Sequence, residues 1–367
     1  MAKIRVLVVD DAVVMRKLIT ETLRQDADLE VVGAAAHGKI ALQKIPQVNP
    51  DLLTLDLEMP EMDGLETLRE VRKLYPKLPV ILFSTLSKKG AVATLDALAL
   101  GANDYVTKPA NVGSVTEGMQ RLREELIPKI KVLCRHLYPP AATTHQGPPV
   151  SCRDLFFSSP SPLRKTLIEI VCIGTSTGGP NALAAVFAQL PAGLPVPIVI
   201  VQHMPPMFTA MLAERLSAHS TVPCQEAGEG QALERAHAYI APGGRHMEVL
   251  RSNTCMRLHL HDGPPENSCR PAVDVLFRSV AAAYGENVLG VVMTGMGQDG
   301  LRGCEMIRER RGQVIVQDEA TSVVWGMPGS VAQAGLADKA IPIHQIAAEI
   351  IVRVKENRPD VRSQSTI

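Results

Sequence analysis

Apolar runs that end in a polar or glycine-rich segment recur along this chain, and they restrict its fold more than any other feature. Five of them lie in the first third of the sequence: IRVLVVD, LEVVGAA, DLLTLD, PVILFS and DYVTK. Amphipathic stretches separate them, as in the helical segment from about Ala12 to Arg24. Buried strands that alternate with helices are typical of parallel α/β sheets. The pattern predicts a doubly wound domain of five strands and five helices that closes near Leu133.

A second series of the same kind begins at about residue 167. The segments LIEIVCIG, VPIVIVQ, NVLGVVMTG and GQVIVQD predict strands, and EVLRSNTCMRLHL predicts a hairpin. Between the two series, a stretch rich in Pro, Ser and Thr predicts a linker. A chain of 367 residues suits two cores of roughly 100 to 200 residues each. We therefore expect four parts: an α/β domain over 1–133, a linker over 134–166, a second α/β domain over 167–355 and a polar tail over 356–367.

Charge and cysteine content narrow the class of protein. The 38 Lys and Arg residues balance the 38 Asp and Glu residues, so no overall field concentrates nucleic acid or anionic membrane around the chain. The seven cysteines form no CxxC pair, and no charged-then-apolar leader begins the sequence. No apolar stretch approaches the roughly 20 residues of a membrane span. We expect a cytoplasmic protein with reduced thiols and no nucleic-acid partner.

Polar residues at the strand ends of the first series predict a phosphorylation site. Asp10 and Asp11 end the first strand and Asp56 ends the third, so the three carboxylates should meet at one edge of a parallel sheet. Such a cluster repels itself unless a cation is bound, and oxygen ligands suit Mg²⁺. Asp56 is then placed to attack a phosphoryl donor, with Lys108 pairing the acyl phosphate and Ser84 supplying a hydroxyl. Taken singly, an Asp pair is an ordinary helix cap and a Lys is usually solvated.

These residues resemble the receiver domain of two-component response regulators over about residues 1–131. The matching positions are Asp10-Asp11, Asp56, Met59-Pro60, Asp63-Gly64, Ser84, Tyr105 and Lys108-Pro109. The resemblance implies a flavodoxin-like (βα)5 fold and phosphotransfer from a histidine kinase to Asp56. It implies Mg²⁺ held by Asp11, Asp56 and the Glu58 carbonyl within the cluster that includes Asp10. It also implies that Ser84 and Tyr105 switch state with phosphorylation, beside Lys108.

A second set of polar residues follows strands of the second series. The segments are GTSTGGP from Gly174, QHMPP from Gln202 and GMGQDG from Gly295. We expect Ser176, His203 and Asp299 to meet at the sheet edge, where a serine hydroxyl would have a base and the base an orienting carboxylate. GTSTG also fits G-x-S-x-G at a strand-to-helix turn. The alternatives are a glycine-rich phosphate cradle, a turn histidine and an aspartate at a helix N-cap.

The second domain resembles the C-terminal domain of CheB-type protein-glutamate methylesterases. The resemblance covers about residues 167–355 and rests on GTSTGGP, QHMPP, IAPGGRHM, HDGPP, RPAVDVLF and GMGQDG. The order Ser, His, Asp differs from that of the α/β-hydrolases, which disfavours their fold. The resemblance implies a Rossmann-like parallel-sheet esterase domain with an added hairpin and no cofactor. It implies Ser176 as nucleophile, His203 as general base and acid, and Asp299 as the residue that orients His203.

The same resemblance extends to the groups around the reacting atoms. It implies the backbone N–H groups of Thr177 and Met296 as oxyanion donors. Thr175 and Met207 stand where the family more often has alanine and glycine, which bears on the shape of the substrate groove. Four further residues either line an open cleft or act as turns and caps: His261, Asp262, Arg270 and Asp274.

Together the two resemblances imply phosphorylation-activated demethylation of glutamate methyl esters, and deamidation of glutamines, on chemoreceptors. The implied partners are a histidine kinase and methyl-accepting chemoreceptors, with membrane contact only through those receptors. Two alternatives stay open: an esterase or deamidase of another substrate, and a phosphorylation-controlled binding module without catalysis. The domain order predicts that the unphosphorylated receiver blocks the catalytic edge. Phe156 and Phe157 in the linker predict either local packing or a latch between the domains.

Overall fold

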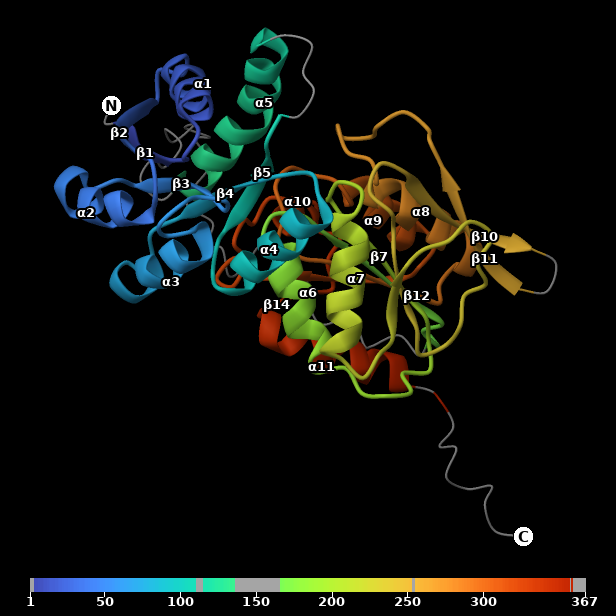
Figure 1. Cartoon of the computed structure of the whole chain (residues 1–367). Coiled ribbons are helices and arrows are strands. Elements are labelled where there is room, and N and C mark those ends of the chain that lie inside the picture. The colour runs from blue at the N-terminus through green and yellow to red at the C-terminus, as the bar shows by residue number, and fades with distance from the viewer. Residues whose placement is uncertain (1–2, 110–114, 136–165, 253–254, 357, 359–367) are drawn as a thin grey trace, which may run out of the picture. The chain divides into compact units, whose positions relative to one another are not determined.

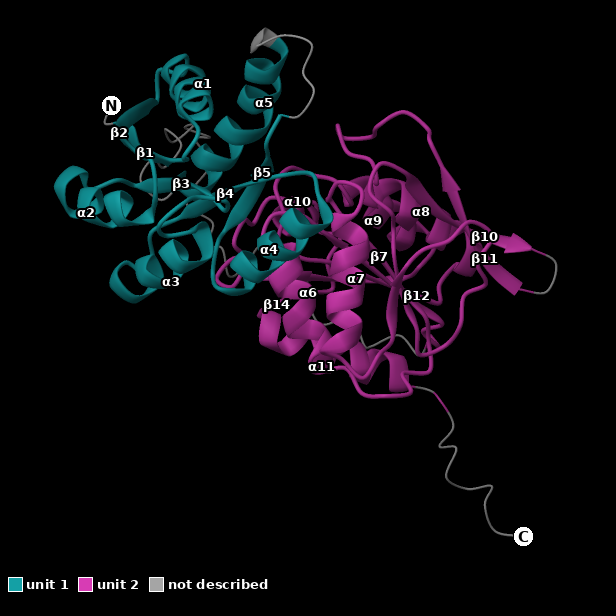
Figure 2. Ribbon diagram, viewed as in Figure 1, with its two compact units in different colours: residues 1–145 teal, residues 146–367 magenta. Residues whose placement is uncertain are grey.

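The structure, a computed structural model, describes residues 3–109, 115–135, 166–252, 255–356 and 358 (Figure 1). It divides into two compact units, Met1–His145 and Gln146–Ile367, and the division falls inside the predicted linker (Figure 2). Phe156 and Phe157, most of the linker and most of the predicted tail lie outside the described residues.

The first unit is a parallel sheet with the strand order β2-β1-β3-β4-β5. The strands are β1 (Ile4–Val9), β2 (Leu29–Ala35), β3 (Leu52–Asp56), β4 (Val80–Ser84) and β5 (Asp104–Thr107). The helices are α1 (Val13–Arg24), α2 (Gly38–Val48), α3 (Gly64–Leu74), α4 (Lys88–Ala99) and α5 (Val115–Leu133). Every residue of β3 and β4 is buried, because helices cover both faces of a doubly wound sheet. The strand order reverses direction at β1, and ligands bind doubly wound sheets at that point.

The loop between β3 and α3 fixes the end of β3. A capping box begins α3, in which Asp63 accepts from the N–H of Glu66 and the Glu66 carboxylate accepts in return from the Asp63 N–H. A Cβ on Gly64 would lie 2.3 Å from the carbonyl oxygen of Asp56, so only glycine lets the helix start this close to the strand. This close packing fixes Asp56 at the carboxyl end of β3, which pairs with β1.

The second unit contains a seven-stranded parallel sheet with the order β14-β13-β12-β6-β7-β9-β8. Its strands are β6 (Ile170–Thr175), β7 (Ile198–Gln202), β8 (Cys224–Glu226), β9 (Ala238–Ile240), β12 (Val288–Val292), β13 (Gln313–Gln317) and β14 (Lys339–Ile341). An antiparallel hairpin adds β10 (His246–Ser252) and β11 (Cys255–His261). The helices are α6 (Gly179–Phe187), α7 (Phe208–Ala218), α8 (Val273–Tyr284), α9 (Leu301–Glu309), α10 (Met327–Gln333) and α11 (Ile343–Lys355).

The core of the second unit joins its sheet to one helix and to the hairpin. Apolar residues of β6, β7, β12 and β13 pack with α8 and with the hairpin in one buried cluster. The prediction of two doubly wound α/β domains, the second with a hairpin, is therefore confirmed. The three-residue strands β8 and β14 were not predicted, because so short a run carries little periodic signal. None of the helices in the described part of the chain is long and apolar enough to cross a membrane.

Candidate active site and phosphorylation site

The predicted hydrolytic residues follow neighbouring strands of the second sheet. Ser176 comes directly after β6 and His203 directly after β7, and the last residues of these strands, Thr175 and Gln202, are register partners. Two backbone bonds join the loops: the His203 N–H donates to the Thr175 carbonyl over 3.2 Å, and the Ser176 N–H donates to the Thr294 carbonyl over 3.0 Å. The catalytic edge is thus the carboxyl end of β6 between its neighbours β7 and β12.

Glycines shape the turn that presents Ser176. Gly178 has φ +77°, and a Cβ there would lie 2.6 Å from Cγ2 of Val323. A Cβ on Gly179, where α6 begins, would lie only 1.9 Å from the side-chain oxygen of Gln202. Gln202 itself is buried, and its Nε2 donates to the carbonyls of Ser176 over 2.9 Å and His203 over 3.2 Å. This side chain, which the sequence did not single out, joins the serine loop to the histidine loop.

His203 and Asp299 form a direct pair. Nε2 of His203 lies 2.8 Å from Oδ2 of Asp299, and their side chains are 12% and 3% exposed. Asp299 lies in the loop after β12, one residue before Gly300 at the N-cap of α9, so it is not itself the cap residue.

Backbone N–H groups and one side-chain amide surround the Asp299 carboxylate. Oδ2 accepts from the N–H of Val273 over 2.6 Å. Oδ1 accepts from three donors near 3 Å: the N–H groups of Asp274 and Gly300, and Nδ2 of Asn267. Burial raises the pKa of Asp299, but the hydrogen bond and charge of His203, together with the backbone donors, bring it below its ordinary value. The carboxylate is therefore held ionised against the imidazole.

The other ring nitrogen of His203 faces a thiol. Nδ1 lies 3.5 Å from Sγ of Cys269. Burial lowers the pKa of His203, but the hydrogen bonds to Asp299 and Cys269 outweigh it and raise the pKa to about 9. Because Asp299 occupies Nε2, Nδ1 is the nitrogen left for proton transfer with a substrate or nucleophile. Among the described contacts, none joins the His203 ring to the Ser176 hydroxyl, and catalytic hydrogen bonds are often formed only when substrate binds.

The two residues expected to supply oxyanion donors lie in two of these loops: Thr177 follows β6, and Met296 lies in the loop after β12 that also carries Asp299. Thr177 follows the serine, is buried, and accepts a hydrogen bond from Oγ1 of Thr294 at its carbonyl over 2.9 Å. The Gly295 carbonyl accepts from the N–H groups of Gly326 and Met327, which fixes the turn before Met296. Within the described residues, the Met296 N–H has no hydrogen-bond acceptor. This N–H group can therefore donate a hydrogen bond to a ligand.

The first unit brings the predicted carboxylates together. One oxygen each of Asp10, Asp11 and Asp56 lies within 4.8 Å of the others, with Asp11 exposed and the other two buried. Nζ of Lys108 lies 2.7 Å from Oδ2 of Asp56 and 3.2 Å from Oδ2 of Asp10. These two oxygens accept no aligned hydrogen bond, so the lysine contacts are ion pairs and the oxygens keep the capacity to bind a cation. The donor set fits a hard divalent cation such as Mg²⁺.

Burial dominates the ionisation of this cluster. It raises the pKa of Asp56 to about 6; the charge of Asp10 adds to the rise, while Lys108 opposes it. The same partners raise the pKa of Lys108 above its ordinary value although its own burial acts in the other direction. Two buried carboxylates with one ammonium leave net negative charge, which a bound cation would neutralise.

The remaining predicted receiver residues lie around the cluster. The Glu58 N–H donates to Oδ1 of Asp56 over 3.3 Å, which places the Glu58 backbone beside the carboxylate. Ser84 is buried at the end of β4, where its Oγ accepts from Oγ1 of Thr94 over 2.6 Å and donates to the Gly90 carbonyl over 3.2 Å. Tyr105 is 6% exposed, and burial raises the pKa of its hydroxyl well above the ordinary value.

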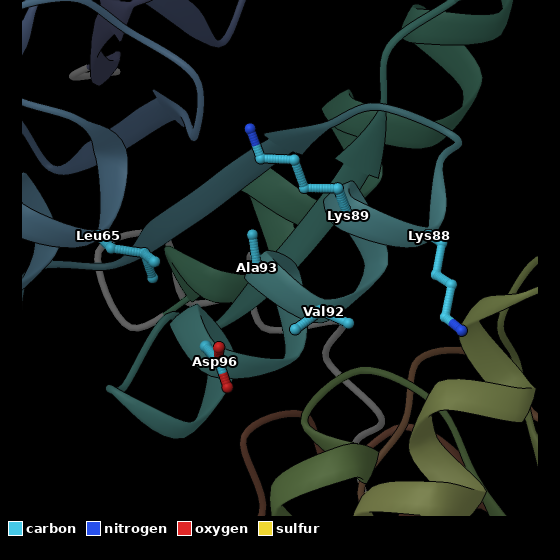
Figure 3. Close-up of a pocket in the computed structure, with 6 residues that line it drawn as sticks. All are labelled: Leu65, Lys88, Lys89, Val92, Ala93 and Asp96. Carbon is cyan, nitrogen blue, oxygen red and sulfur yellow. The ribbon is translucent and has the colours of Figure 1, made fainter.

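A shallow pocket on the first unit lies apart from the predicted site residues. It is lined by Leu65 of α3 and by residues of α4, which are Lys88, Lys89, Val92, Ala93 and Asp96 (Figure 3). The lining is largely apolar, and none of the predicted site residues contributes to it.

Sequence reasoning missed three residues of the second site. Gln202, Asn267 and Cys269 contact the loops or side chains of the predicted triad, as described above. Asp274, predicted either to line a cleft or to cap, is the second residue of α8 and accepts from the Gly303 N–H over 2.7 Å. The only available signal was position: Gln202 ends a strand, and Asn267 and Cys269 lie next to RPAVD, one of the segments that carry the resemblance.

Comparison with known proteins finds a matching family for each of the two domains. The family profile of the CheB methylesterase matches residues 171–350, and that of the response regulator receiver domain matches residues 6–120. A protein-glutamate methylesterase/protein-glutamine glutaminase of Trichodesmium erythraeum is 53% identical over 96% of this chain and all of its own length. One of the same name from a Nocardioides species is 51% identical over 98% of each chain. The Thermotoga maritima CheB methylesterase catalytic domain is 40% identical, with a TM-score of 0.50, over 50% of this chain and 98% of its own.

Proposed function

Because this chain belongs to the CheB methylesterase family and carries a response regulator receiver domain, we propose that it is a phosphorylation-controlled protein-glutamate methylesterase and protein-glutamine glutaminase. The observation that supports this most strongly is the buried His203–Asp299 pair, 2.8 Å apart, at the sheet edge that also carries Ser176. We assign residues 1–133 to the receiver, 134–166 to the linker and 167–355 to the esterase. The proposed setting is the cytoplasm, with a histidine kinase as phosphodonor and methylated chemoreceptors as substrates.

The first half of the reaction forms an acyl-enzyme. The Ser176 oxygen attacks the γ-carbonyl of a glutamyl methyl ester while Nδ1 of His203 takes the hydroxyl proton. The resulting imidazolium is stabilised by Asp299 at Nε2. When the tetrahedral intermediate collapses, His203 gives its proton to the departing methoxide, and methanol leaves. A glutamine substrate follows the same path and loses ammonia.

The second half releases glutamate. His203, neutral again, removes a proton from water as the water attacks the acyl carbonyl, and the Ser176 oxygen leaves with the proton that His203 returns. The net reaction consumes one water for each ester bond. The N–H groups of Thr177 and Met296 are our candidates for binding the oxyanion in both tetrahedral states, and one such donor is commonly worth about 10²- to 10³-fold in kcat.

The receiver supplies control through its carboxylate cluster. Asp56 is the proposed acceptor of the phosphoryl group, and Lys108, which pairs with it already, would pair with the acyl phosphate. Asp11, Asp56 and the Glu58 carbonyl would hold Mg²⁺, with Asp10 completing the cluster; the bound cation neutralises phosphoryl charge. Ser84 and Tyr105 would change conformation with phosphorylation. We propose that the unphosphorylated receiver restricts access of receptor to the esterase and that phosphorylation relieves this restriction.

The experiment that tests this function measures methanol release from methylated chemoreceptor membranes by the full chain, with and without acetyl phosphate. Release should rise with the phosphodonor and vanish in Ser176→Ala, whose receiver should still be phosphorylated. The Asp56→Asn variant should keep the basal rate and lose the stimulation. An absence of methanol release from receptors, with Asp56 still phosphorylated, would reject the proposed substrate. Equal hydrolysis of free glutamyl methyl ester would favour a small-molecule esterase.

A further inference from the structure

One tight turn contacts both members of the His203–Asp299 pair. Glu266 and Cys269 exchange backbone hydrogen bonds of 3.1 and 2.9 Å across the turn. The two residues between them, Asn267 and Ser268, have φ +51° and φ +62°. Positive φ at both central positions is the property of a type I′ turn, and asparagine tolerates that conformation better than most residues. The turn is thus a defined piece of backbone with its own sequence requirement.

The turn is anchored to the helix behind the site. The carboxylate of Glu266 receives two hydrogen bonds from the guanidinium of Arg278 on α8, of 2.6 and 2.7 Å. Two parallel hydrogen bonds of this kind fix the orientation of the Glu266 carboxylate as well as its distance from Arg278. From this anchor the turn reaches Asp299 through Asn267 and reaches His203 through Cys269.

The Asn267 amide joins two carboxylates. Its Nδ2 lies 2.9 Å from Oδ1 of Asp299 and 2.9 Å from Oδ2 of Asp274. An NH₂ group has two hydrogens, so one can go to each acceptor. Two carboxylate neighbours also settle which end of the amide points inward, since the carbonyl oxygen would be repelled by both. Although Asn267 as a whole is exposed, its amide nitrogen faces the buried pair.

The two carboxylates need such a bridge. Asp299 and Asp274 are 3% and 1% exposed, and the charge of Asp299 adds to the burial that raises the pKa of Asp274. Both can stay ionised only if donors between them offset their repulsion. Without the bridge, a proton shared by the pair would remove the charge that Asp299 presents to His203.

We propose that Asn267 is a positioning residue for catalysis, which bridges Asp299 and Asp274 and so keeps Asp299 ionised and aimed at Nε2 of His203. This inference deepens the proposed function at the same site and rests on it for its kinetic consequences. Asn267 touches no reacting atom in this scheme. Its effect passes through Asp299 alone.

Charged groups from several elements face this carboxylate pair. They are His203 after β7, Glu266 in the turn, Arg278 on α8, and Arg302 and Cys304 on α9. In Asn267→Gly the pKa of the pair should rise, since its shared donors are lost. A carboxylate whose folded pKa is raised destabilises the fold at pH values above that pKa, and the effect disappears as falling pH protonates it. The variant should therefore be less stable than wild type near neutral pH, and the difference should shrink as the pH falls below about 4, where the wild-type carboxylates also take up protons.

Asn267→Gly is the sharpest variant, because glycine keeps the positive φ of the turn while removing the amide. Ser268→Gly is the matched control, since it changes the other left-handed position and contacts neither carboxylate. Asp274→Asn in the Asn267→Gly background is the rescue. It removes the charge repulsion and supplies an amide donor on the side that faced Asn267, while its oxygen still accepts from the Gly303 N–H.

Kinetics and stability are both measured on the full chain. In Asn267→Gly we expect kcat for methanol release to fall about tenfold, with KM changed less than about twofold, as for one lost hydrogen bond to a charge. Ser268→Gly should keep the wild-type kcat, and the double variant should recover most of the loss. Trp325 is the only tryptophan and lies in the second domain, so its fluorescence follows unfolding of that domain in urea at each pH.

The outcomes separate this inference from the proposed function. An unchanged kcat in Asn267→Gly, or a loss that Asp274→Asn leaves unrepaired, would overturn the positioning by Asn267. If wild type releases no methanol, the proposed function fails, but the stability measurement still decides the bridge. A destabilisation by Asn267→Gly that is equal at about pH 3 and pH 7 would overturn it; one that shrinks at the lower pH would support it.

Discussion

The Asp299→Asn variant tests how the carboxylate sets the tautomer of the catalytic base. Oδ1 of Asp299 accepts three N–H groups, whereas Oδ2 accepts from Val273 and contacts His203. An asparagine gains most hydrogen bonds by keeping its oxygen at the Oδ1 position, so its nitrogen takes the place of Oδ2. Nε2 of His203 must then accept a hydrogen bond, and the ring proton moves to Nδ1. Nδ1 can no longer receive the proton of Ser176.

The size of the loss follows from these contacts. Holding the base in the wrong tautomer lowers kcat by about 10⁴-fold in a serine triad, which is about 5 kcal/mol in the barrier. The new amide nitrogen also faces the N–H of Val273, and an unsatisfied buried donor costs about 1–3 kcal/mol of stability. We therefore expect a folded but nearly inactive enzyme that is measurably less stable than wild type.

Methanol release from methylated receptor membranes measures the rate, with Ser176→Ala as the background. Glu305→Gln is a matched carboxylate-to-amide control: among the described residues Glu305 pairs with exposed Arg302 on the same helix and with no other side chain, so kcat should stay unchanged. A kcat within tenfold of wild type in Asp299→Asn would refute the tautomer argument.

Three further predictions concern the surroundings of the base. Since the pKa of His203 is raised to about 9 and the base must be neutral to take a proton, kcat/KM should rise with pH up to about 9; a plateau reached below about pH 7 would contradict this. N-ethylmaleimide should abolish methanol release by modifying Cys269, whose Sγ is 3.5 Å from Nδ1; Cys269→Ser should resist the reagent and Cys255→Ser should not. Gly243→Ala should lower kcat by about 10²-fold, because its Cβ would lie 2.3 Å from the backbone N of Pro206 in the loop that carries His203; a wild-type rate would show that the loop yields without moving the base.

The meeting of His203 and Asp299 was predictable from the sequence, because the residues after parallel strands share one edge. Each follows a short run of apolar residues that predicts a buried strand, and the β6 neighbours β7 and β12 bring the two loops to the same place. The carboxylates Asp10, Asp11 and Asp56 were predictable for the same reason. In both domains the predicted site residues lie at the ends of strands, and apolar runs in the sequence mark the ends of strands well.

Asn267 and Cys269 were not predictable in this way. They lie in a turn whose path depends on two positive φ angles and on an anchor, Arg278, that is separated from them in the chain. No periodic pattern marks such a turn, and an Asn-Ser pair in an exposed segment is indistinguishable from any other loop. Gln202 was not predicted for a different reason. In the sequence it is only the polar residue that ends a strand, and its role depends on the hydrogen bond to the Ser176 carbonyl in the folded chain.

The orientation of the His203 ring ties these unpredicted residues to the chemistry. In the common serine triad the carboxylate takes Nδ1 and the serine takes Nε2. Here Asp299 takes Nε2, and Nδ1 faces the Cys269 thiol. A thiol is a weak hydrogen-bonding partner, so Ser176 can replace it at Nδ1 with little loss. The turn that contacts Asp299 through Asn267 therefore also places Cys269 against the ring nitrogen that must take the proton of Ser176.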